Sequence, residues 1–385
     1  MKSLSKYIPL LLTLIVFFQN PIWIFWNVGM YGIAICSILL FLILNKRIER
    51  QRHSYKTKIF PITFYISFFI FFMSLYEIRL SSVFFLFILI CLPIISNEEK
   101  NKTLNLITTV LCVIVSVSLV PWFINTFLYK LSWGYEMYYA DWKGDDGKTV
   151  LTNYYLFVQA KHDFIIRFYS LFDEPGVLGT LGAFVLIANR FNFRDKRNIV
   201  ILIGCIFTFS LAFYVLVSIG LILLSKISFK NIFFGGLFVL PVLYFLLGNE
   251  TFNTSIIDRA NNYDDSSIES RTSGALNQFF DEYVTTIDFI LGKGLKFFSE
   301  NKAMSGQGYK FFLIEYGLLG FVILLLIYIS FIKNYNRQSF WVLFIFLISF
   351  LQRPSLFTPW CLIIFVLAIS QYERLPVIKP KHISK

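Results

Sequence analysis

The sequence predicts an all-α polytopic membrane protein with about twelve transmembrane helices, some short or re-entrant, and two large extracytoplasmic loops. The chain is 57% hydrophobic and only 15% charged, a balance typical of membrane proteins. Apolar segments recur along its whole length, many of them near the ~20 residues that a span needs. These segments are 8–26, 28–44, 59–76, 80–96, 104–127, 174–190, 198–225, 232–247, 309–331, 339–351 and 359–371.

The segments and loops divide the chain into five parts. We expect N-terminal transmembrane helices, a first extracytoplasmic loop, central transmembrane helices, a large extracytoplasmic helical loop, and C-terminal transmembrane helices with a cytoplasmic tail. Their bounds are 1–127, 128–173, 174–247, 248–308 and 309–385.

Clusters of basic residues indicate which side each loop faces. Lysines and arginines gather in 46–58, in 190–197, and at Lys226 with Lys230. Because cytoplasmic loops carry an excess of these residues, we place all three inside, together with both termini. The outer loops then carry a net negative charge, and the overall +12 reflects topology. A basic folded surface with interleaved aromatics, which nucleic-acid binding would need, is not indicated.

Segment 198–225 lies between two cytoplasmic loops, so it crosses the membrane an even number of times. It is long for one span and short for two full ones. Thr208, Phe209 and Ser210 interrupt it near the middle. We expect two short helices, or a re-entrant hairpin, turning near Ser210, since irregular backbone at that depth needs protein or a wet cavity around it. The alternative is one long tilted helix.

Cysteine and histidine usage excludes several kinds of site. The five cysteines all fall within apolar segments, so no disulfide framework or paired-cysteine metal site is indicated. The three histidines, at 53, 162 and 382, are too scattered for a zinc site. We therefore expect no metal and no cofactor.

The large outer loop, 248–308, carries the first informative pattern. Ser266 to Glu269 is typical of a capping box. Apolar residues then recur at helical spacing, which predicts one amphipathic helix over 267–291, ended by Gly292. Arg271 lies beside the apolar face. The residues of that face are Ile268, Thr272, Leu276, Phe279, Phe280, Tyr283, Ile287 and Leu291.

The first outer loop ends in a second pattern, from Arg167 to Gly179. Asp173 and Glu174 stand at the entrance to a predicted span, and Pro175 suits a first helical turn. Carboxylates at a helix N-terminus are also favoured by the helix dipole, which is a purely structural role. Arg167 lies among aromatics, where a snorkelling anchor is the corresponding alternative.

These residues resemble bacterial O-antigen polymerases of the Wzy type. The resemblance rests on Arg167 followed by Glu174-Pro175 and Gly179, on Arg271, on Gly-Lys-Gly at 292–294, and on Glu-Tyr-Gly at 315–317. It spans about residues 160–320. It implies an all-helical membrane glycosyltransferase with two large outer loops. The implied reaction transfers a growing glycan from undecaprenyl diphosphate to a lipid-linked repeat unit.

The related O-antigen ligases share this architecture but carry a histidine shortly before the last motif. Gly306 occupies that position here, and residues 249–320 contain no histidine. This departure favours a polymerase over a ligase.

The chemistry fits the residue types. A diphosphate leaving group needs cations, and guanidinium groups bind phosphate oxygens bidentately, while an acceptor hydroxyl needs a carboxylate that positions it or removes its proton. Glu315 lies inside a predicted span, where an acid is a functional candidate. Pairing with Lys310 or another outer basic group is its structural alternative. We assign catalysis to Arg167, Glu174, Arg271 and Glu315, and substrate binding to Arg167, Arg259, Arg271, Lys293 and Tyr309.

Aromatic residues of the first outer loop are candidates for stacking on substrate sugars, or for an interfacial belt alone. They include Trp133, Tyr135, Tyr138, Tyr139 and Trp142.

The expected partners are undecaprenyl-diphosphate-linked oligosaccharides and the bilayer, with a chain-length regulator and a flippase as further candidates. The expected location is the bacterial cytoplasmic membrane, with the site facing outward and no metal involved. Two alternatives remain: ligase-like transfer to another acceptor, and transport of lipid-linked oligosaccharide. A transporter would favour charges near mid-membrane and internal repeats.

Overall fold

The computed structural model describes most of the predicted helices. The described residues are 4–20, 22–25, 28–50, 62, 66, 80–138, 150–160, 167–224, 274–294, 296–301, 304, 308–332, 336–352 and 355–373. The predicted segments 59–76 and 232–247 fall almost entirely outside them, as does the proposed capping box at Ser266.

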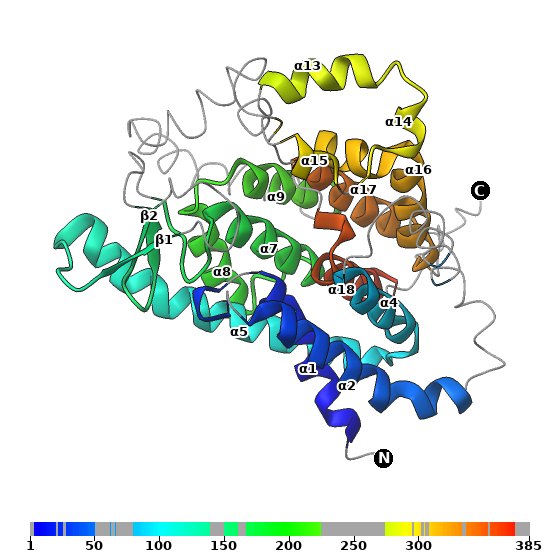
Figure 1. Cartoon of the computed structure of the whole chain (residues 1–385). Helices are drawn as coiled ribbons and strands as arrows, with labels where there is room; N and C mark the ends of the chain where they lie inside the picture. Colours follow the sequence, from blue (N-terminus) through cyan, green and yellow to red (C-terminus); the bar gives the residue numbers. More distant parts are fainter. Residues whose placement is uncertain are drawn as a thin grey trace, which may run out of the picture.

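The N-terminal part consists of helices that pack side by side, α1 against α2 and α5, and α2 against α4. In Figure 1 the long helix α5 (cyan) runs below α7 (Pro175–Ala188) and α8 (Lys196–Ile206). The elements are η1 Leu4–Tyr7, α1 Ile8–Gln19, η2 Trp23–Phe25, α2 Gly29–Arg50, α4 Leu80–Cys91, η4 Leu92–Ile94, α5 Asn97–Phe123 and the π-helical turn η5 Ile124–Leu128.

Helix α5 begins with a reciprocal capping box. Ser96 Oγ accepts from the Glu99 amide at 3.3 Å, and the Ser96 amide donates to Glu99 Oε2 at 3.0 Å. The Glu99 carboxylate also accepts hydrogen bonds from both terminal nitrogens of Arg47, each at 2.9 Å. One carboxylate therefore starts α5 and ties it to the end of α2.

The predicted first outer loop contains a small antiparallel sheet that was not expected from the sequence. Strand β1 (Tyr135–Tyr138) pairs with β2 (Val150–Asn153), and β2 pairs with β3 (Val158–Ala160). The protein is mostly helical, with this sheet as an addition.

The central and C-terminal helices form the core. They are α7 Pro175–Ala188, α8 Lys196–Ile206, α9 Leu211–Leu224, α16 Tyr309–Ser330, α17 Arg337–Gln352, η8 Ser355–Phe357 and α18 Pro359–Tyr372. Nearly every side chain of α7 and α18 is buried. Phe184 of α7 stacks on Phe346 of α17 with ring centroids 3.9 Å apart. Helix α7 is the central helix, since it contacts α5, α8, α9 and α18.

Segment 198–225 is divided as predicted. Helix α8 ends at Ile206 and α9 starts at Leu211. Between them Phe209 has a φ of 46°, in the left-handed region. The expectation of a break at Ser210 is confirmed, and the alternative of one continuous helix is wrong.

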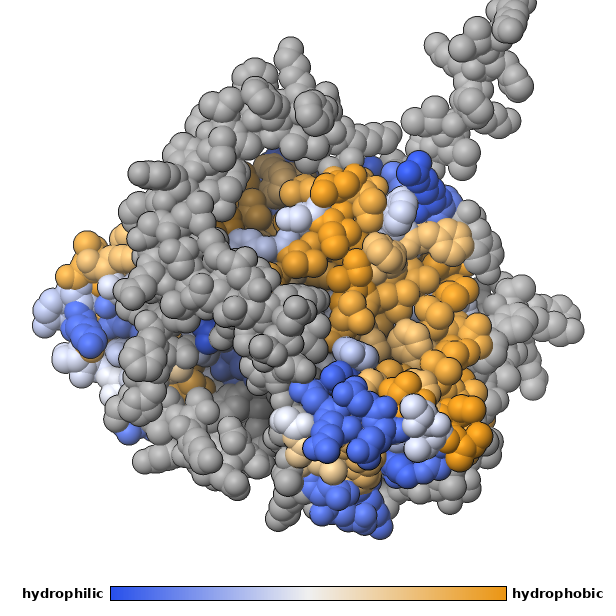
Figure 2. All heavy atoms as spheres, turned by 90° about the horizontal axis from the view of Figure 1, so that it is seen from above, coloured by the Kyte–Doolittle hydropathy of each residue, from blue (hydrophilic) through white to orange (hydrophobic). Residues whose placement is uncertain are grey.

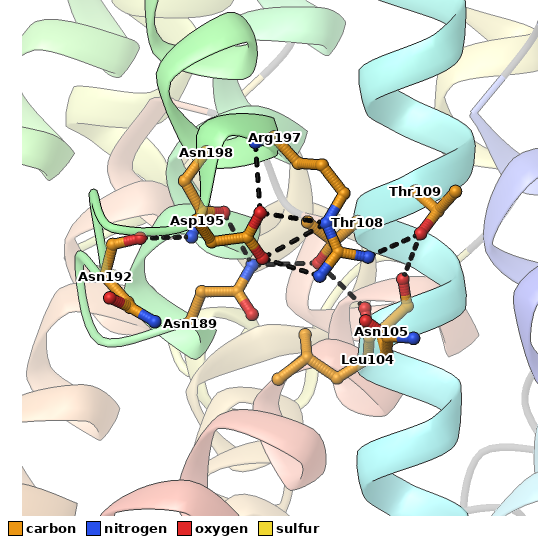
Figure 3. A network of polar contacts seen from close by, with 9 residues as sticks. All are labelled: Leu104, Asn105, Thr108, Thr109, Asn189, Asn192, Asp195, Arg197 and Asn198. Atoms are coloured by element: carbon orange, nitrogen blue, oxygen red, sulfur yellow. Dashed lines mark hydrogen bonds and ion pairs between the residues drawn. The ribbon is translucent and has the colours of Figure 1, made fainter.

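A polar network fixes the connection between α7 and α8 against α5 (Figure 3). Asn189 Nδ2 donates to Thr108 Oγ1 at 2.8 Å and to Asn198 Oδ1 at 2.9 Å. Arg197 reaches Thr109 Oγ1 at 2.7 Å and pairs with Asp195 at 2.6 Å. The pairing holds the Asp195 pKa below its usual value, chiefly because the Arg197 side chain donates hydrogen bonds to the carboxylate.

Within the part of the chain that the structure describes, two helices are long and apolar enough to span a membrane, Asn97–Leu128 and Tyr309–Ser330. The shorter apolar helices lie in α1, α2, α4, α7, α9, α17 and α18. Seen from above, hydrophobic residues form a broad area beside a compact hydrophilic patch (Figure 2). By length and composition these helices give a weak indication of membrane association.

The outer amphipathic helix is not continuous, so the expectation of one helix over 267–291 is wrong. Its described part is α13 (Gly274–Tyr283) followed by α14 (Asp288–Leu291), with α15 (Phe297–Glu300) beyond. Thr285 and Thr286 hydroxyls bond to the carbonyls of Glu282 and Tyr283 at 2.7 and 2.8 Å. These residues stand in a run of β-branched side chains, which disfavour helix and compete for its carbonyls.

Candidate functional site

The segment from Arg167 to Glu174 runs below the surface and is held from several sides. The Phe168 amide donates to the Phe207 carbonyl at 2.9 Å, in the break between α8 and α9. Ser170 Oγ lies 2.8 Å from Ser118 Oγ of α5, and the Ser170 carbonyl accepts from the Val158 amide of β3 at 2.8 Å. The segment therefore joins the outer sheet to the helical core.

The charged residues of this segment differ in depth. Asp173 is only 2% exposed, whereas Arg167 and Glu174 are half-buried. Glu174 occupies the N-cap position of α7, with Pro175 in the first turn as predicted, and its side chain makes no capping hydrogen bond. The Glu174 carboxylate thus lies beside the positive end of α7 without being used as its cap.

Gly179 brings α7 against the α8–α9 break. A Cβ atom on Gly179 would lie 2.8 Å from Ser210 Cβ. The residues that interrupt segment 198–225 and those that follow Glu174 therefore meet in one place. The sequence analysis treated these two features separately.

Glu315 lies at an interruption of α16. It is 3% exposed, and two residues later Gly317 has φ 67° and ψ −178°, far from helical values. The Glu315 carbonyl accepts from the Gly294 amide at 3.1 Å, and the Ile314 carbonyl accepts from the Lys293 amide at 2.6 Å. A continuous helix would use those carbonyls for amides four residues further on.

The Gly-Lys-Gly motif thus docks directly on the Glu-Tyr-Gly motif. A Cβ atom on Gly292 would lie 2.6 Å from the Glu315 carbonyl oxygen. Gly292 and Gly294 both have φ of 90°, which other residues rarely adopt. Glycine is required here by close approach and by backbone conformation together.

The lysines near this contact are engaged by other groups. Lys293 Nζ pairs with Asp288 Oδ2. Lys310 Nζ donates to Asn277 Oδ1 at 2.9 Å and lies 5.3 Å from the Phe280 ring centroid. The structural alternative for Glu315 was pairing with Lys310 or another basic group; the Lys310 ammonium bonds Asn277 of α13.

Helix α13 covers the N-terminal end of α16 with aromatic side chains. Leu276, Phe280 and Tyr283 are buried against Ile314, which confirms that part of the predicted apolar face. Tyr309 meets Phe280 edge to face at 6.0 Å. Tyr309 therefore has a packing role. Ile287, which was predicted on the apolar face together with Leu276 and Phe280, is 75% exposed.

The structure places the sequence-predicted site residues in two groups. Arg167 and Glu174 lie on the segment before α7, and Lys293, Tyr309 and Glu315 lie where the outer loop meets α16. Contacts of α7 with α9, α9 with α17 and α17 with α16 connect the groups. Arg259 and Arg271 lie outside the described residues.

Two residues outside the predicted set hold the backbone next to predicted site residues. Tyr283 donates its hydroxyl toward the carbonyls of Asp288 and Leu313, at 2.9 and 3.2 Å. Ser170 has a φ of 55° and anchors the buried segment to α5. Tyr283 was visible in the sequence only as a member of the apolar face, and Ser170 gave no signal.

The predicted first outer loop exposes two aromatic rings, Trp133 just before β1 and Tyr155 between β2 and β3. Trp133 and Tyr155 stack at 6.4 Å and are 44% and 56% exposed. The Tyr155 amide donates to Asn153 Oδ1 at 2.7 Å. Of the aromatic residues predicted to stack on substrate sugars, Tyr139 and Trp142 lie outside the described residues.

Among the described residues, no group of three or more His, Cys, Asp or Glu side chains is arranged to hold a metal ion. No family model, no curated protein and no solved structure matches the chain.

Proposed function

We propose that this chain is a membrane glycosyltransferase that polymerises lipid-linked repeat units, as in O-antigen or capsule synthesis. The donor's anomeric carbon–oxygen bond to undecaprenyl diphosphate breaks, and the hydroxyl oxygen of a second lipid-linked unit bonds to that carbon. The hydroxyl proton passes to a carboxylate, and the diphosphate leaves with the electron pair. The donor glycan is thereby lengthened by one repeat unit.

The observation that carries this proposal is the contact between Gly292–Gly294 and Glu315–Gly317. The resemblance to O-antigen polymerases rests partly on these two motifs. They are separate in the sequence, and no sequence pattern indicates that they are in contact. The Lys293 and Gly294 amides bond to successive carbonyls of α16. A buried acid is thus held beside the outer loop, as an enzyme working on the outer face would need.

The segment before α7 supplies the second half of the proposed site. Arg167 and Glu174 lie on a backbone fixed by α5, β3 and the α8–α9 break. A guanidinium group stabilises charge that develops on a leaving diphosphate, and a carboxylate can position the acceptor hydroxyl. Arg271 and Arg259 complete the cationic set in this proposal.

The proposed setting is the bacterial cytoplasmic membrane, with about twelve spans, both termini inside and the site outside. The basic loops support this orientation. The apolar helices support the location, and the exposed aromatics Trp133 and Tyr155 offer faces on which pyranose rings stack.

A deletion strain discriminates this function from its alternatives. Loss of a polymerase leaves single repeat units attached to the final acceptor. Loss of a ligase leaves long chains that are not attached, and loss of a transporter leaves units trapped on the inner face. Either of the last two outcomes contradicts the proposal.

A further inference from the structure

Three successive carbonyls of α16 accept hydrogen bonds from the outer loop. Leu313 accepts from the Tyr283 hydroxyl at 3.2 Å, Ile314 from the Lys293 amide at 2.6 Å, and Glu315 from the Gly294 amide at 3.1 Å. The helix is interrupted directly after them, at Gly317. The outer loop therefore provides donors along one turn of α16 where the helix itself is broken.

The lysine of this contact acts through its backbone. The Lys293 side chain is about one-third exposed and pairs with Asp288, five residues earlier in the same loop. Its amide, in contrast, makes the shortest of the three bonds to α16. The sequence analysis assigned Lys293 to substrate binding because of its charge, and the structure gives its peptide group a separate role.

Tyr283 connects α14 to α16. Its hydroxyl lies between the carbonyls of Asp288 and Leu313, and its side chain is 2% exposed. Removing that oxygen would loosen α14 and α16 from each other without changing the shape of the buried ring.

We propose that residues 283–294 form a clamp that positions Glu315. The clamp consists of the Tyr283 hydroxyl, the amides of Lys293 and Gly294, and the glycine contact between Gly292 and Gly317. It holds the α16 backbone at residues 313–315 and so fixes where the Glu315 carboxylate lies. Its effect on catalysis rests on the proposed function, whereas the clamp itself does not.

Lys293→Pro and Lys293→Ala form a matched pair for the first test. Proline removes the amide donor and alanine keeps it, while both remove the ammonium group. With purified full-length protein in lipid vesicles and a lipid-linked repeat unit as substrate, we expect turnover to fall about tenfold further in the proline variant than in the alanine variant. Equal losses would show that the side chain acts on substrate, and would overturn the proposal.

Tyr283→Phe tests the same contact without a change of shape. We expect about fivefold slower turnover together with weaker donor binding, since a displaced Glu315 would misplace the cation that it orients toward the donor diphosphate. In a Glu315→Asp background, whose carboxylate is already displaced, the Tyr283→Phe change should have little further effect. Additive losses in the double variant would mean that Tyr283 does not act through Glu315.

Hydrogen exchange tests the clamp apart from activity. The amides of Lys293 and Gly294 should exchange slowly in the unmodified protein and about fivefold or more faster in Tyr283→Phe. Fast exchange in the unmodified protein would overturn the clamp. Slow exchange in a protein that transfers no glycan would leave the clamp standing and refute the proposed function.

Discussion

Gly292 and Gly317 lie backbone against backbone. A Cβ atom on Gly317 would lie 2.5 Å from the Gly292 amide nitrogen, and a Cβ atom on Gly292 would lie 2.7 Å from the Gly317 nitrogen. Both residues have positive φ, 90° and 67°. The outer loop can approach α16 this closely only because neither residue carries a side chain.

Gly317→Ala should therefore destabilise the protein by about 2–4 kcal/mol, from left-handed strain combined with overpacking. Thermal unfolding in detergent measures this. Gly274→Ala is the control, because a Cβ atom there meets nothing within 4 Å at the start of α13. If the two variants unfold at the same temperature, the close contact does not exist in solution.

The Asp195–Arg197 pair gives a pH-dependent contribution to stability. The Asp195 pKa is lowered in the folded protein, so the stabilisation is present above the unfolded pKa of about 4 and is lost as the pH falls through the folded pKa. Asp195→Asn keeps an N-cap residue for α8 but removes the charge. At neutral pH we expect a loss of about 0.5–1 kcal/mol, because both side chains remain partly exposed.

Unfolding of wild type and of Asp195→Asn, measured at neutral pH and near pH 3, tests this pH dependence. The difference between wild type and Asp195→Asn should shrink at the lower pH. Glu98→Gln serves as control, because the Glu98–Lys102 pair is mostly exposed and should contribute little at either pH. A difference that grows as the pH falls would contradict the assignment.

The sequence was most informative where one physical signal dominated. The break at Ser210 followed from loop charge and segment length, and the start of α7 followed from Pro175. The helix predicted over 267–291 was wrong because apolar spacing was given more weight than the β-branched run at Val284–Ile287. The β-branched residues of that run could have predicted the break, because such side chains disfavour helix.

Other features depend on contacts between distant residues, which no local pattern encodes. The three-stranded sheet requires Tyr135 to pair with Asn153 across the intervening loop. The sequence identified Gly292–Gly294 and Glu315–Gly317 as motifs, but their docking depends on the path of α13 and α14 between them. The backbone role of Lys293 was hidden because its side-chain charge suggested a phosphate ligand.

The orientation of the central loops is a separate prediction. Lys226 and Lys230 lie outside the described residues, and their charge places residue 228 in the cytoplasm. A Ser228→Cys variant should react with a membrane-impermeant thiol reagent only after the cells are opened. Labelling from outside intact cells would refute the even number of crossings assigned to 198–225.

Arg271 also lies outside the described residues, and its proposed role is to bind the diphosphate. Arg271→Ala should abolish polymer while the protein stays in the membrane. Arg271→Lys keeps the charge but loses the bidentate fork, so it should still shorten the chains markedly. Gel separation of the polysaccharide measures both, and normal polymer from the alanine variant would remove Arg271 from the site.

The roles of Glu174 and Glu315 are distinguished by where each lies. Glu174 is half-buried at the N-terminus of α7, where an acceptor sugar would approach from the aqueous side. Glu315 is 3% exposed and is held by the outer loop. We therefore assign the acceptor hydroxyl to Glu174, and the orientation of an arginine to Glu315.

On this assignment Glu174→Gln removes polymerisation but retains donor binding, because amide nitrogen cannot accept the hydroxyl proton. Glu315→Gln weakens both donor binding and turnover, since a misplaced arginine affects the ground state and the transition state together. Binding of the lipid-linked donor and its turnover are measured separately for the two variants. If Glu174→Gln polymerises normally while Glu315→Gln binds donor without turning it over, the two roles are reversed, and the carboxylate held by the outer loop is the one that receives the proton.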